Sequence, residues 1–168
     1  ADSYMPAFLA GVNYAKTLAA AYQVPVYQFS HQEGHLMAAQ VTSGMPEANE
    51  FLALHLSGGT SEILKVQTQP HGFKIDIFGQ STDLQAGQFV DRVGVACGIN
   101  FPAGAQLDEL ACHYEGEFTP LASVVKGTDF SFSGPETAAE RLLQQGGQAG
   151  MVAKATFSCI NKTLVKAF

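Results

Sequence analysis

The sequence predicts a mixed α/β protein, and two observations carry this prediction. Apolar residues recur at helical spacing in several segments, of which residues 7–22 and 151–168 are the longest. Between such segments lie short apolar runs rich in branched and aromatic residues, each bounded by glycine or proline. With 46% apolar and 14% charged residues, the 168-residue chain is expected to be globular and to bury a core.

The N-terminal segment predicts a helix, a strand and a second helix. Helical spacing of apolar residues covers Ala7–Tyr22, and Pro25 stops that helix. Val26–Phe29 is then expected to form a short strand. Ser30 and Glu33 have the spacing of a capping box, so a helix is expected from His31 to about Val41. Further along the chain, Gly44 and Pro46 are expected to break that helix.

The central segment predicts an antiparallel meander. The apolar run Phe51–Leu56 ends in Ser57-Gly58-Gly59, which is typical of a strand followed by a tight turn. Two more strands are expected over Ser61–Gln67 and Phe73–Phe78, joined by a turn at Pro70-His71-Gly72.

The C-terminal segment is predicted to be mainly helical. Helices are expected over Val90–Cys97, from Leu107, from Ser133 to about Gln145, and from Met151 onward, with an extended stretch at Phe130–Phe132. Ser133-Gly134-Pro135-Glu136 has the pattern of a capping box with proline near the start of the helix. The last helix reaches Phe168 without a glycine or proline, which favours a piece of a longer protein; the alternative is a terminal helix that frays at its end.

Composition and charge argue against several classes of protein. No apolar run is long enough to span a membrane, and the first residues lack the basic and apolar parts of a signal peptide. The three cysteines are far apart and form no CxxC pair, so we expect buried free thiols and a cytoplasmic protein. A net charge of −6 argues against this segment alone binding a nucleic-acid backbone.

A histidine pair is the first candidate site. His31 and His35 are four residues apart on the predicted helix, so both imidazoles lie on one face and can share a divalent metal. The alternative is two surface histidines, with Glu33 acting only as a cap. A zincin protease has glutamate directly after the first histidine, where this chain has Gln32, so the pattern disfavours that mechanism.

Three further candidates are the turn Ser57-Gly58-Gly59, Asp91 and Gly104. The turn Ser57-Gly58-Gly59 can bring backbone N–H groups close to an anion, although a plain hairpin turn has the same pattern. Asp91 could accept a hydrogen bond from a ribose or from a backbone donor, or be a solvated helix carboxylate. Gly104 could belong to a turn or to the floor of a nucleoside pocket. Ser133 lacks the GxSxG context of a nucleophile, and capping explains it better.

Taken together, these motifs resemble those of the TsaD/Gcp-like family of tRNA N6-threonylcarbamoyladenosine transferases, formerly called glycoproteases or O-sialoglycoprotein endopeptidases. Five segments resemble the family's motifs in order: the metal motif H-x-E-G-H, the phosphate hairpin L-x-V-S-G-G, and D-x-A-A-G-E-A-F-D-K, Y-P-G-G-P and F-S-F-S-G. They correspond here to His31–His35, Leu54–Gly59, Asp83–Arg92, Phe101–Ala105 and Phe130–Gly134.

The resemblance implies a fold, ligands and partners. The fold is that of the actin, sugar-kinase and heat-shock-chaperone superfamily (ribonuclease H-like), incomplete in this chain. Residues 1–50 would end the first α/β domain, with the metal-binding helix, and residues 51–168 would begin the second. The metal, iron or zinc, would be held by His31, His35 and an aspartate outside this chain. ATP or threonylcarbamoyl-adenylate would be surrounded by a set of eight residues: His55, Leu56, Ser57, Gly58, Gly59, Asp91, Gly104 and Asp108.

The implied activity moves a threonylcarbamoyl group onto N6 of the tRNA adenosine beside the anticodon, with tRNA and partner subunits engaged by the full-length protein. Departures from the motifs, Thr60 for histidine, Gln88 for glutamate, Ala103 for glycine and Ala105 for proline, indicate a divergent branch. Two alternatives therefore stay open, a metalloprotease and a non-catalytic nucleotide-binding scaffold subunit. The isolated chain, expected to be inactive, is also expected to self-associate through the apolar stripe of its last helix.

Overall fold

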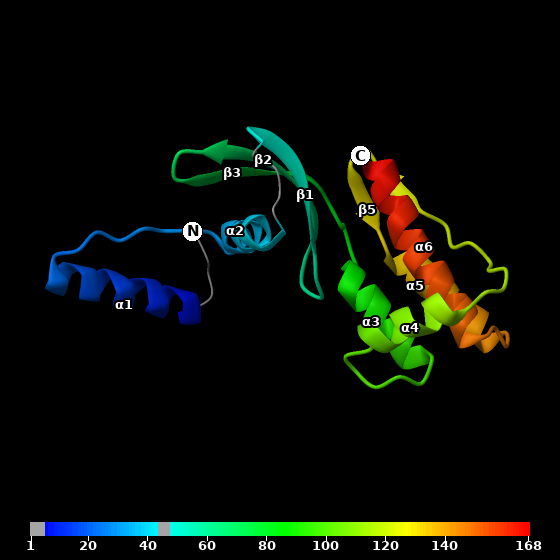
Figure 1. The fold of residues 1–168 in the computed structure, drawn as a ribbon. Coiled ribbons are helices and arrows are strands. Elements are labelled where there is room, and N and C mark those ends of the chain that lie inside the picture. The colour runs from blue at the N-terminus through cyan, green and yellow to red at the C-terminus, as the bar shows by residue number, and fades with distance from the viewer. Residues whose placement is uncertain (1–5, 44–47) are drawn as a thin grey trace. The chain divides into compact units, whose positions relative to one another are not determined.

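The computed structural model describes residues 6–43 and 48–168, and it confirms a mixed α/β architecture (Figure 1). The chain divides into two compact units. The first comprises residues 1–49 and 68–73, and the second comprises residues 50–67 and 74–168. The residues predicted to break the second helix, Gly44 and Pro46, lie outside the described ranges.

The first unit contains helices α1 (Pro6–Tyr22) and α2 (His31–Ser43), both predicted from the sequence. The predicted strand Val26–Phe29 is wrong, because this segment pairs with no strand in the described part of the chain. The capping box is confirmed: Ser30 N–H donates to Glu33 Oε2 at 2.6 Å, and Glu33 N–H donates to Ser30 Oγ at 3.1 Å.

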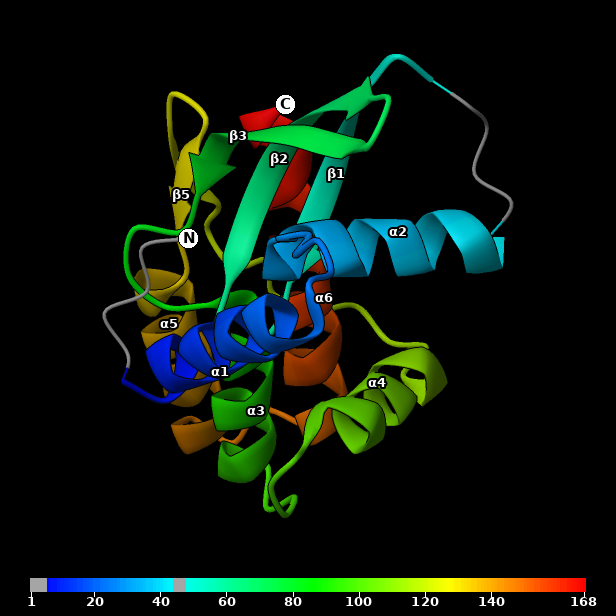
Figure 2. The same cartoon turned by 90° about the vertical axis from the view of Figure 1, so that its left-hand side faces the viewer.

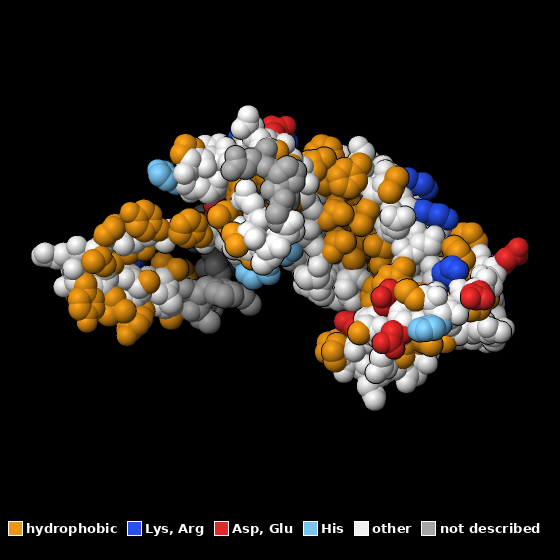
Figure 3. Space-filling view, in the orientation of Figure 1, with side chains coloured by type: hydrophobic (Ala, Val, Ile, Leu, Met, Phe, Trp, Pro, Cys, Tyr) orange, Lys and Arg blue, Asp and Glu red, His pale blue; other side chains and the backbone are white. Residues whose placement is uncertain are grey.

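Helix α1 exposes most of its apolar side chains. Among its side chains that the structure describes, only Ala19 is buried, whereas Leu9, Val12, Leu18 and Tyr22 are exposed. Figure 3 shows several apolar side chains on the visible surface of this helix. None of the described helices combines the length and the hydropathy needed to cross a bilayer.

Three strands form the predicted meander, in the order β1 (Glu50–Leu56), β2 (Ser61–Gln69) and β3 (Gly72–Gln80) (Figure 2). The antiparallel register of β1 and β2 places His55 opposite Glu62, and Leu56 opposite Ser61. This register makes residues 57–60 a tight turn at the end of the hairpin.

Four helices complete the second unit: α3 (Ala86–Ala96), α4 (Gly104–His113), α5 (Ser133–Gln144) and α6 (Ala149–Ala167). A small antiparallel pair joins β5 (Asp129–Ser131) to β4 (Val124–Lys126), a strand that the sequence did not predict. Phe89 and Phe132 stack in the core with ring centroids 5.7 Å apart, so α3 is packed against the β5–α5 junction.

The structure corrects three predictions in this unit. Helix α3 begins at Ala86, four residues before the predicted start at Val90. No side chain caps α5, because the Ser133 hydroxyl donates to Asp83 instead, so the predicted capping box there is wrong. Helix α6 packs against α3, α4 and α5. Its apolar stripe is therefore mostly buried, and the expectation of an uncovered last helix is wrong.

Candidate metal and nucleotide sites

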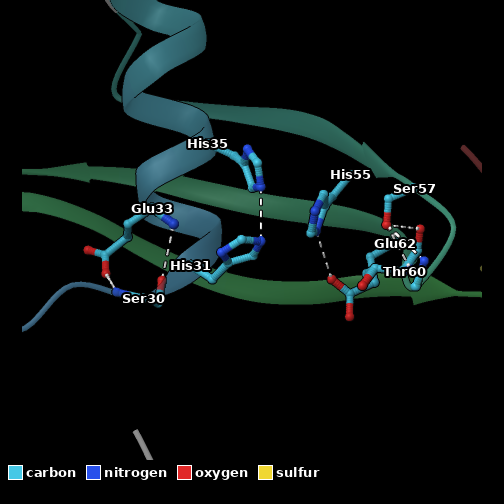
Figure 4. Close-up of polar contacts among 9 residues, drawn as sticks. Ser30, His31, Glu33, His35, His55, Ser57, Thr60 and Glu62 are labelled. Carbon is cyan, nitrogen blue, oxygen red and sulfur yellow. Dashed lines mark hydrogen bonds and ion pairs between the residues drawn. The ribbon is translucent and has the colours of Figure 1, made fainter. Parts of the chain in front are cut away.

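The two candidate metal ligands lie on the exposed face of α2. His31 and His35 are one helical turn apart, and their ring planes cross at 87° (Figure 4). Their Nε2 atoms are 2.9 Å apart, so one ring donates a hydrogen bond to the other. Two imidazole nitrogens that converge on one point form the kind of pair that iron or zinc binds in proteins. The donor set therefore fits a divalent transition metal.

Glu33 is not available as a catalytic base at this pair. Its Oε2 accepts the Ser30 N–H, and its Oε1 accepts the Phe73 N–H at 3.4 Å. The backbone hydrogen bond from Ser30 is the main cause that lowers the pKa of Glu33 below its ordinary value. The carboxylate is thus an ionised cap that closes the first turn of α2.

The hairpin turn between β1 and β2 is organised by the hydroxyl of Ser57. This oxygen accepts the backbone N–H groups of Gly59 at 3.1 Å and of Thr60 at 2.9 Å, while Ser57 N–H donates to the Thr60 carbonyl at 2.7 Å (Figure 4). Two amides therefore converge on one oxygen. Such a concave group of N–H donors also suits a phosphate oxygen.

The glycines around this turn are needed for different reasons. A Cβ atom added at Gly58 or Gly59 would meet nothing within 4 Å, so the fold itself leaves room for a side chain at both positions. A Cβ atom added at Gly87 would lie 2.6 Å from Gly58 N. Glycine is required at position 87 because the start of α3 lies directly against the backbone of the turn, where the Gly87 N–H donates to the Ser57 carbonyl at 3.1 Å.

A cavity of about 480 Å³ opens beside this contact, within the size range of small-molecule sites. Its polar lining comes from the turn and from Asp91, and most of the remaining wall is apolar. The lining residues are Leu56, Ser57, Ala86, Gly87, Val90, Asp91, Pro102, Gly104, Ala105, Phe157 and Ile160.

Asp91 connects two walls of the cavity. Its Oδ1 accepts the Ala103 N–H at 2.9 Å, which fixes the turn that leads into α4. The backbone donor considered from the sequence is thus present. A Cβ atom added at Gly104 would be 3.7 Å from Val90, an ordinary contact, so the packing of the chain does not demand glycine there.

Four of the predicted ligand residues do not line this cavity. His55 lies on β1, where its Nδ1 is 3.6 Å from a carboxylate oxygen of Glu62 on β2. Gly58 and Gly59 form the tip of the turn. Asp108 lines a separate cavity of about 430 Å³ along α4 and α6, together with Lys154.

Sequence reasoning missed the wall formed by α6. Phe157 and Ile160 follow the turn by about a hundred positions. Ile160 belongs to the predicted apolar stripe of the last helix, which indicates only a core position, and Phe157 lies outside that stripe. Only the packing of α6 along α4 brings them to the cavity. The Ala86-Gly87 pair could be recognised from the sequence, because two small residues allow the backbone to come close to a ligand.

Comparison with known proteins gives the family. The family model described as tRNA N6-adenosine threonylcarbamoyltransferase matches residues 4–168. The chain belongs to this threonylcarbamoyltransferase family. Relatives carrying the same description include proteins of Geobacillus thermodenitrificans, 38% identical over 148 residues, and Lactiplantibacillus plantarum, 35% identical over 146 residues. Each alignment covers 86% of this chain.

The match covers only part of the threonylcarbamoyltransferase relatives. The chain spans about two fifths of their length, 41% of the Geobacillus protein and 40% of the Lactiplantibacillus protein. Two of this chain's departures from the motifs lie next to the candidate site. Thr60 closes the hairpin turn, and Ala103 is fully buried next to Asp91.

Proposed function

We propose that the full-length protein transfers a threonylcarbamoyl group to N6 of the tRNA adenosine beside the anticodon, using a divalent metal and ATP or threonylcarbamoyl-adenylate. The observation that carries the proposal is the cavity between the hairpin turn and Asp91, in a chain that belongs to the threonylcarbamoyltransferase family. The proposal includes the actin, sugar-kinase and heat-shock-chaperone fold, completed outside this chain, with a domain division near residue 50. It also includes a cytoplasmic location, and tRNA and partner subunits as macromolecular partners.

The cavity suits an adenine nucleotide. Its apolar walls, with Val90 and Phe157, can cover a base, and the Asp91 oxygen that does not bind Ala103 can accept a ribose hydroxyl. The amides of Gly59 and Thr60 can donate to a phosphate when the Ser57 hydroxyl turns away. The chain's own contribution is thus to bind and orient the activated ligand.

His31 and His35 would hold iron or zinc, with an aspartate outside this chain as third ligand. When bound, the ion supplies positive charge that polarises an oxygen of the substrate. The helix fixes the spacing of the two imidazoles, so both Nε2 atoms can approach one ion.

One observation counts against the metalloprotease alternative. Both oxygens of Glu33 accept backbone N–H groups, which leaves the metal motif without a carboxylate aimed at a metal-bound water. The non-catalytic scaffold alternative is supported only by the departures from the family motifs at Thr60 and Gln88.

The decisive experiment uses the full-length protein with its partner subunits, unmodified tRNA and threonylcarbamoyl-adenylate. Mass spectrometry of the digested tRNA should detect threonylcarbamoyladenosine. If the protein binds ATP but leaves the tRNA unmodified, the scaffold alternative replaces the transferase. If it instead cleaves a glycoprotein in a metal-dependent way, the protease alternative does.

A further inference from the structure

Asp83 is the most heavily hydrogen-bonded carboxylate in the described part of the second unit. Its Oδ1 accepts the N–H groups of Leu84 at 2.5 Å and of Phe132 at 3.0 Å. Its Oδ2 accepts the Ser131 hydroxyl at 2.6 Å and also the Ser133 hydroxyl. A carboxylate offers about four acceptor positions, and four donors occupy them here. Asp83 therefore has no acceptor position left for a ligand.

The loop that carries Asp83 is attached on both sides. Thr82 N–H donates to the Phe130 carbonyl at 2.8 Å, which ties the loop to β5. Three residues beyond Asp83, Ala86 N–H donates to the Ser61 hydroxyl on β2 at 2.7 Å. The next residue, Gly87, donates its N–H to the Ser57 carbonyl in the hairpin turn. Ala86 and Gly87 both line the cavity.

The Phe-Ser-Phe-Ser segment has no direct place in the cavity. Phe130 and Phe132 are buried in the core, and the cavity wall contains neither Ser131 nor Ser133. Both hydroxyls instead donate to Asp83. The two hydroxyls of the segment are thus linked to the candidate site through this carboxylate, while its two phenylalanine rings pack in the core.

We propose that Asp83 is a positioning residue, which fixes the Ala86-Gly87 wall of the nucleotide cavity by joining the β3–α3 loop to the β5–α5 junction. This inference rests on the proposed function for the identity of the ligand, though not for the mechanical link. Loss of the carboxylate removes four of the hydrogen bonds around the loop and leaves it attached to β5 through Thr82, so the first turn of α3 is held less firmly on that side.

The ionised form of Asp83 suits this role. Desolvation raises the pKa of the carboxyl group, but the hydrogen bonds from Ser131, Ser133 and the two backbone amides together lower that pKa well below its ordinary value. The carboxylate is therefore charged throughout the neutral range.

The test is hydrogen exchange and ATP binding in the full-length protein carrying Asp83→Asn. The amide of asparagine replaces one acceptor oxygen with a donor, so two of the four bonds must change. The matched control is Asp129→Asn, because the Asp129 carboxylate also accepts a backbone N–H, that of Gln80 at 3.0 Å, but this bond is to the last residue of β3 and not to the loop that leads into Ala86 and Gly87. Exchange is measured by mass spectrometry without nucleotide, and ATP affinity by calorimetry well below the unfolding temperature.

We expect Asp83→Asn to speed exchange of residues 84–89 at least about tenfold, which corresponds to about 1.4 kcal/mol, and to weaken ATP binding by a similar factor. Asp129→Asn should leave both within about twofold. If Asp83→Asn does not fold, the double change Ser131→Ala and Ser133→Ala keeps the carboxylate, removes two donors, and should show the same direction.

Unchanged exchange at residues 84–89 would overturn the inference, whether or not ATP binds. Faster exchange with unchanged ATP affinity would also overturn it, since the wall would then be loose without consequence for the ligand. A wild-type protein that binds no ATP would refute the proposed nucleotide site, while the exchange result would still decide whether Asp83 fixes this segment.

Discussion

The contact between Gly94 and Ala103 gives the sharpest quantitative prediction. Both residues are buried, and a Cβ atom added at Gly94 would lie closer than 3.0 Å to that of Ala103, a separation that real Cβ atoms essentially never show. Favourable carbon–carbon contacts lie at about 3.5–4.0 Å. The change Gly94→Ala therefore forces α3 away from the turn that Asp91 holds through Ala103 N–H.

Two opposing effects set the magnitude. Overpacking a buried contact costs about 1–3 kcal/mol, and the overlap here places the cost in the upper half of that range. Alanine in place of glycine inside a helix stabilises by about 1 kcal/mol. We expect Gly94→Ala to lower the free energy of unfolding by about 1–2 kcal/mol, from the difference of these terms.

A compensating change separates this clash from other causes. Ala103→Gly removes the opposing methyl group, so Gly94→Ala with Ala103→Gly should return to within about 0.5 kcal/mol of the wild type, a coupling typical of residues in contact. Gly11→Ala in α1 is the matched control, because an added Cβ atom there meets nothing within 4 Å and should only stabilise.

Urea denaturation of the full-length variants, monitored by circular dichroism, measures these differences in unfolding free energy, provided that the variants share one m-value. Additive effects of Gly94→Ala and Ala103→Gly would refute the contact. A stabilising Gly94→Ala would do the same, since only the helix propensity would then remain.

The other predictions concern ligands, pH and assembly. Gly58→Val should leave the unfolding free energy within about 0.5 kcal/mol but abolish ATP binding measured by calorimetry; unchanged affinity would remove the turn from the nucleotide site. His35→Ala should lose bound metal, as measured by atomic absorption, whereas the control His71→Ala should keep it; equal metal content would place the ion elsewhere. The folded-state pKa of Asp83 lies below its ordinary value, so its stabilisation is present above about pH 4 and is lost as pH falls further. The stability deficit of Asp83→Asn against wild type, from urea denaturation, should therefore shrink between pH 7 and pH 3, and a constant deficit would show that ionisation is irrelevant. The isolated chain should self-associate through α1 rather than α6, and light scattering that shows a monomer at all concentrations would contradict this.

Two capping boxes show where sequence reasoning succeeds and where it fails. Ser30 and Glu33 form the predicted reciprocal bonds, because both partners lie within one helical turn. Ser133 and Glu136 have the same spacing, yet the Ser133 hydroxyl donates to Asp83 and Glu136 lies 3.6 Å from Arg92. Local patterns predict local bonds only when no distant group competes for the same atoms.

The same limit explains the errors in the strands and the cavity. Val26–Phe29 has strand-forming residues, but a strand also needs a partner, and the pattern within one segment contains no information about its partner. Leu56 and Asp91 could be assigned to a site by their motifs. Phe157 and Ile160 could not, because only the packing of α6 distinguishes a cavity wall from the core.

A glycine in a motif can be required by the packing of the chain itself or by a ligand, and only the structure distinguishes the two cases. Gly87 is demanded by the folded chain itself, since any side chain there would collide with the backbone of the hairpin turn. Gly58, on the other side of the same contact, has open space around it, and no steric demand of the described fold explains its small size. A glycine at an unstrained, open position is best explained by something that approaches it from outside the chain. On the proposed function this is a phosphate group, to which the amides of Gly59 and Thr60 would donate. The turn is thus built by Ser57 and Gly87 and kept open by Gly58, a division of roles that the nucleotide hypothesis requires and a plain hairpin does not.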